Sequence, residues 1–170
     1  AFIATKFGEN YDVKTGVTTV SLTADAARAC FAASRQKLGQ VHLLYSHITS
    51  QITNDEALQV LRDTALTAAL LNIKKQEGVL LGTSISHTSA LQTAMAEGLV
   101  EHLDVLQLPA PMVLQETQMV AELAASGKAI VVNSPVRKLK NLGPEVTVPC
   151  EAYSKLLAVP GVSMLLTGAR

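Results

Sequence analysis

The feature that most limits the fold of this chain is a fivefold recurrence, in which a helical pattern stops at a glycine and a short apolar run follows. The glycines are Gly39, Gly78, Gly98, Gly127 and Gly161, and the runs after them include "VHLLYS", "VLLGTS", "LDVLQL", "AIVVNS" and "VSMLLTG". Glycine takes the left-handed conformation at the carboxyl end of a helix at little cost. Each glycine therefore predicts the end of a helix, and each run predicts a strand.

The pattern predicts six strands that alternate with five helices. Helices are expected at Thr23–Leu38, Asp55–Lys75, Thr88–Glu97, Leu114–Ala125 and Cys150–Val159, with Thr23 and Asn54 as amino-terminal caps of the first two. Strands are expected at Phe2–Thr5, Val41–Tyr45, Val79–Leu81, Val105–Leu108, Ile130–Asn133 and Met164–Leu166. Most of these strands are continuous apolar runs, which is typical of parallel sheets covered by helices. The chain is therefore expected to be an α/β protein, either an open doubly wound sheet or a (β/α)8 barrel with strands missing.

The composition excludes several other classes of protein. The 170 residues suffice for a single domain with a sizeable core, and 48% of them are hydrophobic. The formal net charge is zero and no basic face stands out, which argues against nucleic acid as a partner. No apolar run is long enough to span a membrane. The two cysteines, Cys30 and Cys150, lie far apart in predicted helices and are expected to be small core residues or free thiols, not a disulfide framework.

Polar side chains gather where the predicted strands end. In chain order they are Lys6, Ser46, His47, Thr83, Ser84, Ser86, Gln107, Asn133, Ser134, Thr167 and Arg170. Both candidate architectures place functional groups at the carboxyl ends of parallel strands. His47 and Lys6 are the candidates for chemistry, although a strand-end histidine or a lone lysine is more often structural. No GxGxxG, P-loop or G-x-S-x-G motif occurs, and the four histidines lack the paired spacing of a metal site.

Taken in order, the strand sequences resemble those of the aldo-keto reductases. The segments are "FIATKFG", "VHLLYSH", "GVLLGTS", "LDVLQLP", "AIVVNSPV" and "VSMLLTGAR". They are similar to the family's third to eighth strands. In the family the third strand ends in Thr/Ser-Lys, and the fourth to eighth strands read like "DLLYLH", "IGVSN", "VVQVPYN", "VIAYSPL" and "VIPGAR". The resemblance covers nearly the whole chain. It implies a (β/α)8 barrel that is incomplete here, with about six βα units and the first two strands missing. Residues 1–170 would form a single domain that is truncated at both ends.

The resemblance also implies a reaction, the NADPH-dependent reduction of aldehydes or ketones. His47 would orient the substrate carbonyl, and Lys6 would lower the pKa of a catalytic tyrosine. Ser84 and Gln107 would bind the nicotinamide amide, Ser134 would lie near the cofactor's diphosphate, and Arg170 would open the last phosphate-binding loop. The partner would be a small carbonyl compound, and a cytoplasmic location is expected, with an organelle left open because the chain starts without Met.

Several positions depart from the family pattern. The family's catalytic Tyr and Asp belong to the two missing strands, and neither Tyr11 nor Tyr45 stands in an equivalent place. Ile85 occupies the position of an amide-binding Asn, and Ala110 and Pro111 replace the Tyr and Asn of "PYN". Three hypotheses follow: part of a carbonyl reductase, an inactive scaffold or regulatory subunit with protein partners, or an open α/β nucleotide-binding domain.

Overall fold

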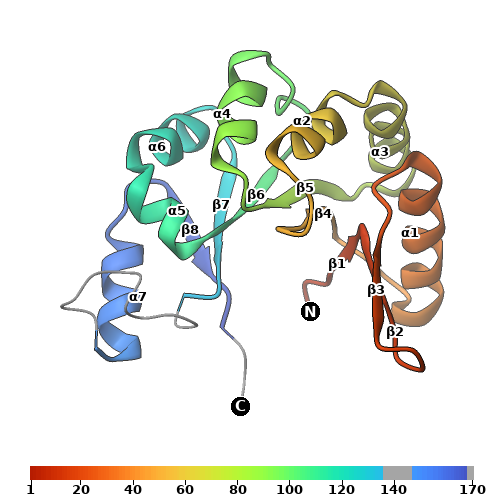
Figure 1. Ribbon diagram of the computed structural model, residues 1–170, viewed down its shortest axis with the longest axis horizontal. Helices are drawn as coiled ribbons and strands as arrows, with labels where there is room; N and C mark the ends of the chain where they lie inside the picture. The colour runs from red at the N-terminus through yellow and green to blue at the C-terminus, as the bar shows by residue number, and fades with distance from the viewer. Residues whose placement is uncertain (136–146, 168–170) are drawn as a thin grey trace. The chain divides into compact units, whose positions relative to one another are not determined.

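A computed structural model describes residues 1–135 and 147–167 of the chain. The chain forms two compact units, Ala1–Leu103 and Asp104–Arg170. Each unit contains three parallel strands connected through helices (Figure 1). In the described residues no helix has the length and apolarity that crossing a membrane requires.

In the first unit, parallel strands β1 (Ala4–Phe7), β4 (Leu43–Ile48) and β5 (Leu80–Ile85) pair in that order. The intervening helices are α1 (Ala24–Leu38), α2 (Asn54–Arg62) and α3 (Thr64–Glu77), and α4 (Thr88–Ala96) follows β5. Helix α1 packs on β1 and α3, and α2 packs on α4 (Figure 1). The core consists largely of strand and helix aliphatic side chains, among them Leu44, Leu81 and Leu91.

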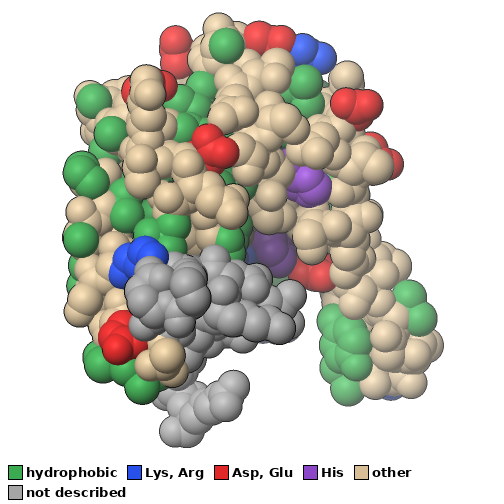
Figure 2. All heavy atoms as spheres, turned by 60° about the vertical axis from the view of Figure 1, so that its left-hand side comes forward, with side chains coloured by type: hydrophobic (Ala, Val, Ile, Leu, Met, Phe, Trp, Pro, Cys, Tyr) green, Lys and Arg blue, Asp and Glu red, His purple; other side chains and the backbone are tan. Residues whose placement is uncertain are grey.

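A short antiparallel hairpin follows β1 and was not expected from the sequence. Its strands are β2 (Glu9–Asp12) and β3 (Val17–Val20). The hairpin projects from the body of the first unit (Figure 1), and hydrophobic side chains gather on the projection (Figure 2). Gly8 joins β1 to the hairpin with a φ of 116°, a value that favours glycine. This turn sends the chain back towards the carboxyl end of β4.

The second unit contains the parallel strands β6 (Val105–Pro109), β7 (Ala129–Asn133) and β8 (Val162–Leu165). Helices α5 (Ala110–Gln115) and α6 (Thr117–Ala125) connect β6 to β7, and α7 (Pro149–Leu157) precedes β8. Their buried side chains, such as Leu106, Val132 and Leu156, form the core of this unit. Pro149 is the first residue of α7, where its missing N–H costs no helical hydrogen bond.

The structure confirms the six parallel strands and corrects two helix predictions. The single helix expected at Asp55–Lys75 is two helices, α2 and α3, which meet at Asp63. The cap of α2 is Thr53, which forms a capping box with Glu56, and not Asn54. The helix expected at Leu114–Ala125 is likewise divided into α5 and α6 at Glu116. Both cysteines are free thiols, as predicted.

Candidate functional site

Three predicted site residues of the first unit come together at the carboxyl end of its sheet. Lys6 lies on β1, His47 on β4 and Ser84 on β5. Lys6 is in register with Tyr45, and His47 is in register with Ser84. Because side chains alternate between the faces of a strand, Lys6, Tyr45, His47 and Ser84 all belong to the same face.

The Lys6 ammonium lies in the middle of this group. Its Nζ donates a hydrogen bond to Ser84 Oγ over 3.1 Å and lies 5.4 Å from the centroid of the Tyr45 ring. Burial of the ammonium lowers the pKa of Lys6, and the charge of Glu9 partly opposes that change. Lys6 therefore supplies a positive charge next to Ser84 and Tyr45, within the reach of a group bound at the strand ends.

His47 contacts a carboxylate that the sequence analysis missed. Its Nδ1 lies 3.2 Å from Glu9 Oε2, and both side chains are 31% exposed. Burial lowers the pKa of His47, the Lys6 charge lowers it further, and the Glu9 charge opposes both. His47 is therefore held mostly neutral near physiological pH while it faces groups of both charge signs.

Glu9 reaches His47 because of the turn at Gly8. A Cβ on Gly8 would lie 3.0 Å from the His47 carbonyl oxygen and 2.6 Å from Leu22 Cδ2, so only glycine fits this close approach. Glu9 Oε1 also accepts a hydrogen bond from Gln51 Nε2 over 3.1 Å. The sequence held only a weak signal for the hairpin. Gly8 precedes the segment Glu9–Asp12 and Gly16 precedes Val17–Val20, but neither segment is a continuous apolar run.

Tyr45 is unsuited to donate a proton at this site. Its side chain is buried, with 4% of its surface exposed. Burial raises the pKa of Tyr45 to about 12. A proton-donating tyrosine needs the opposite change, because its ordinary pKa already lies well above neutrality. That Tyr45 does not replace the family's catalytic tyrosine stays a prediction.

The other predicted cofactor-binding residues lie in the second unit. Gln107 is on β6 and only 1% exposed. Ser134 follows β7, is exposed, and has a left-handed φ of 51°, which is unusual for a residue other than glycine. Arg170 lies outside the described residues. Among the residues that the structure does describe, no group of three or more His, Cys, Asp or Glu side chains could hold a metal ion.

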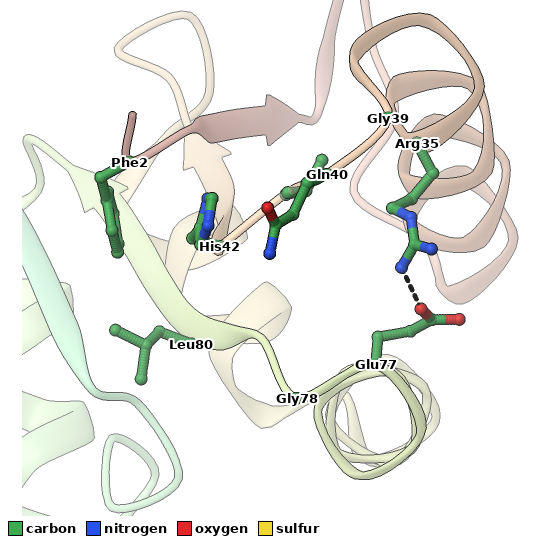
Figure 3. A pocket seen from close by; sticks show the side chains of 9 residues that line it. Phe2, Arg35, Gly39, Gln40, His42, Glu77, Gly78 and Leu80 are labelled. Carbon is green, nitrogen blue, oxygen red and sulfur yellow. Dashed lines mark hydrogen bonds and ion pairs between the residues drawn. The ribbon is translucent and has the colours of Figure 1, made fainter.

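A separate hollow of about 550 Å³ lies at the opposite end of the first unit's strands (Figure 3). Phe2, Gln40, His42, Gly78 and Leu80 contribute to its lining, and all of them precede or begin a strand. Arg35 and Glu77 form an ion pair across one side of it (Figure 3). The amino-terminal face of such sheets usually contributes stability and not chemistry, so Lys6, His47 and Ser84 remain the candidate site.

Comparison with known proteins identifies the fold. No protein-family model and no curated protein sequence matches the chain. Among solved structures, a protein from Pseudomona aeruginosa assigned to the aldo-keto reductases matches 98% of the chain at 18% identity, with a TM-score of 0.73. The chain has the fold of the aldo-keto reductases. The holo form of the aldo-keto reductase AKR11C1 from Bacillus halodurans matches 99% of it, at 14% identity and a TM-score of 0.70.

The chain spans only part of these aldo-keto reductase structures. It covers 60% of the Pseudomona protein and 62% of the Bacillus protein. A glycerol dehydrogenase from Gluconobacter oxydans, AKR11B4, matches 89% of the chain with a TM-score of 0.56, and 46% of that protein is covered. The expected fold, part of a (β/α)8 barrel of aldo-keto reductase type, is confirmed. The open doubly wound sheet was the wrong alternative.

Proposed function

We propose that the chain is part of an NAD(P)H-dependent oxidoreductase that reduces aldehydes or ketones. The observation that carries this proposal is the meeting of Lys6, His47 and Ser84 on one face at the carboxyl ends of three parallel strands. The aldo-keto reductase fold supports it, because the sequence resemblance assigns functional roles to these same three residues.

These side chains suit a reaction that creates negative charge on a carbonyl oxygen. When bound, NADPH would supply a hydride to the carbonyl carbon. The Lys6 ammonium would lower the pKa of the tyrosine that protonates the oxygen, and His47 would hold that oxygen through a ring nitrogen. The partial burial of His47 strengthens its interaction, because the surroundings screen charge less than water does.

The donor set also suits the cofactor. Ser84 has a hydroxyl that can donate and accept, which fits the carboxamide of a nicotinamide, and the Gln107 amide has the same ability. Ser84 and Gln107 are covered by protein in this structure, so each would have to turn outward to reach a ligand. We assign Ser134 and Arg170 to the phosphate groups, and propose NADPH as the cofactor and a small carbonyl compound as the substrate.

A catalytically inactive scaffold or regulatory subunit is the second candidate. Ile85 is buried and Ala110 is fully buried, so the two positions supply core packing where the resemblance expects hydrogen bonds to cofactor. A scaffold would keep the barrel shape without the reaction, since fold does not determine function. It would bind NADPH weakly or not at all.

Turnover by site variants tests the reductase proposal. Oxidation of NADPH would be followed with a set of aldehydes and ketones, using the wild-type chain, His47→Ala and Lys6→Met. We expect kcat to fall by about 10²-fold or more in each variant, as is usual when a proton-handling group is removed. Lys14→Met, on the hairpin turn, is the matched lysine control and should leave kcat unchanged. Equal rates in all four proteins would refute the site assignment.

A further inference from the structure

A histidine outside the candidate site is hydrogen-bonded to the strand end that carries His47. His87 Nε2 lies 2.8 Å from the carbonyl oxygen of Thr49, which comes two residues after His47 and is 5% exposed. We infer that His87 is a positioning residue that fastens the carboxyl end of β4 to the start of α4, and so fixes where His47 lies relative to Ser84. The resemblance to aldo-keto reductases gave His87 no role.

The direction of this hydrogen bond follows from its acceptor. A backbone carbonyl oxygen has lone pairs and no proton, so His87 Nε2 must be the donor. Both the neutral Nε2–H tautomer and the imidazolium have a proton on Nε2, and therefore both can form the bond. The contact excludes only one form of the His87 ring, the neutral tautomer with its proton on Nδ1.

The His87–Thr49 bond lies where the pairing of two strands stops. β4 and β5 are in register as far as the pair Ile48 and Ile85. Thr49 follows that pair on one strand, and His87 lies two residues beyond it on the other. The His87 ring therefore adds one connection after the end of the ladder, made by a side chain in place of a backbone N–H. His47, which precedes Ile48, lies between the ladder and this added connection.

His87 does not make the contact that its own position in the chain favours. It is the N-cap of α4, yet its side chain forms no cap hydrogen bond. Helices α1, α2 and α3 of the same unit each have a side-chain cap, from Thr23, Thr53 and Asp63. Such caps stabilise a helix because they accept a hydrogen bond from one of its first N–H groups. The His87 ring instead crosses to β4, where it orders the strand end and not its own helix.

The turn that His87 holds is also connected to the candidate site. Thr49 Oγ1 accepts a hydrogen bond from the Gln51 N–H over 2.9 Å, which shapes the turn after β4. Gln51 Nε2 in turn donates to Glu9 Oε1 over 3.1 Å, and the other oxygen of Glu9 lies beside His47. Thr49 is thus bonded on two sides, to His87 through its carbonyl and to the turn through its hydroxyl. Movement of Thr49 would therefore displace His47 and Glu9 together.

The consequence for catalysis rests on the proposed reductase function. There His47 orients the substrate carbonyl, and a small displacement of an orienting group lowers the rate because the reacting atoms are no longer aligned. Loss of the His87–Thr49 bond should therefore lower kcat, although His87 is a positioning residue and not a catalytic one.

Two substitutions at His87 separate positioning from helix stability. His87→Ser removes the bond to Thr49 but supplies a hydroxyl that can cap α4, so the free energy of unfolding should be unchanged or higher. His87→Gln keeps an N–H donor at a similar reach and should preserve the bond. Ser89→Ala, at an exposed position in the first turn of the same helix, is the control.

NMR spectra of the chain without cofactor measure the bond and its effect on β4. Long-range ¹H–¹⁵N correlation spectra with labelled histidine should show a protonated Nε2 on His87 at both acid and alkaline pH, and His87→Gln identifies its signals. Amide hydrogen exchange at residues 47–49 should be about tenfold faster in His87→Ser, as loss of one hydrogen bond implies. It should be unchanged in His87→Gln and Ser89→Ala. Leu43, at the start of β4, should keep its exchange rate in all variants.

Turnover then measures the effect on the reaction, and the outcomes separate this inference from the proposed function. With NADPH and a carbonyl substrate, kcat should fall about tenfold in His87→Ser and stay near the wild-type value in His87→Gln and Ser89→Ala. A neutral His87 ring protonated on Nδ1, or unchanged amide exchange in His87→Ser, would overturn the inference. So would equal kcat in His87→Ser and wild type. If exchange changes as expected but the wild-type chain reduces no carbonyl, the role of His87 at β4 stands and the reductase proposal fails.

Discussion

At the scale of single residues, burial decides which groups near the strand ends can exchange protons. Tyr45 keeps its hydroxyl proton because its phenol is covered by protein. Lys6 and His47 are less enclosed, and burial lowers the pKa of each, of Lys6 from 10.5 and of His47 from 6.5. The division of roles at this site therefore follows from how deeply each side chain lies, and not from residue type alone.

The Tyr45 environment predicts a loss of stability at high pH. The pKa of Tyr45 is about 12 in the folded chain, above the ordinary value of 10.0. The folded state therefore holds this proton more tightly, and its contribution is complete below pH 10.0 and is lost as pH rises towards about 12. The loss is about 3 kcal/mol at most.

Denaturant unfolding at a series of alkaline pH values measures this effect. Tyr45→Phe should show a shallower decline in the free energy of unfolding than wild type. Tyr11→Phe, at an exposed tyrosine of the hairpin, should follow the wild-type curve. Parallel curves for wild type and Tyr45→Phe would show that the Tyr45 phenol is not the protected group.

Residue identity alone could predict Lys6, His47 and Ser84 as site candidates, because each follows or ends an apolar run. It could not predict Glu9, whose role depends on a turn of the backbone and on a strand 38 positions later in the chain, where His47 lies. Polar segments such as Glu9–Asp12 give no apolar pattern from which a strand can be read. Side-chain pairs between such segments become visible only in three dimensions.

At the scale of elements, the glycine pattern predicted the ends of α1, α3, α4 and α6 to within two residues, whereas α7 ends at Leu157, four residues before Gly161. All five glycines have a positive φ, from 66° at Gly78 to 93° at Gly161. The break between α2 and α3 escaped prediction because neither glycine nor proline marks it. Asp63 makes the break, since its Oδ1 accepts hydrogen bonds from the N–H groups of Ala65 and Leu66. A helical periodicity that continues through such a cap looks like one long helix.

The cap at Asp63 gives a prediction for stability. Asp63→Ala removes the only side-chain acceptor that the structure shows at the start of α3, and should lower the free energy of unfolding by about 1 kcal/mol. Asp55→Ala is the control, because Asp55 is exposed in the first turn of α2 and Thr53 forms the cap there. Denaturant midpoints of the two variants would be compared. An unchanged denaturant midpoint for Asp63→Ala would mean that α3 does not depend on its cap.

At the scale of the whole molecule, the fold was predicted from the order of the strand sequences along the chain. The ordered series of six segments pointed to the aldo-keto reductase barrel, and the solved structures confirm this fold over 98% of the chain in the best-covered Pseudomona match. Identity of 18% or less does not transfer an activity, so the reaction rests on the cluster of Lys6, His47 and Ser84. That the chain behaves as a single domain stays a prediction.

The most direct test of the central claim is to map where NADPH binds. Backbone NMR spectra of the labelled chain would be recorded as NADPH is added. The account predicts saturable shifts at Lys6, His47 and Ser84, at the carboxyl ends of the strands, and unchanged signals from Gly39 and Gly78 beside the hollow at the other end. Shifts confined to Gly39 and Gly78, or no saturable shifts at all, would contradict it.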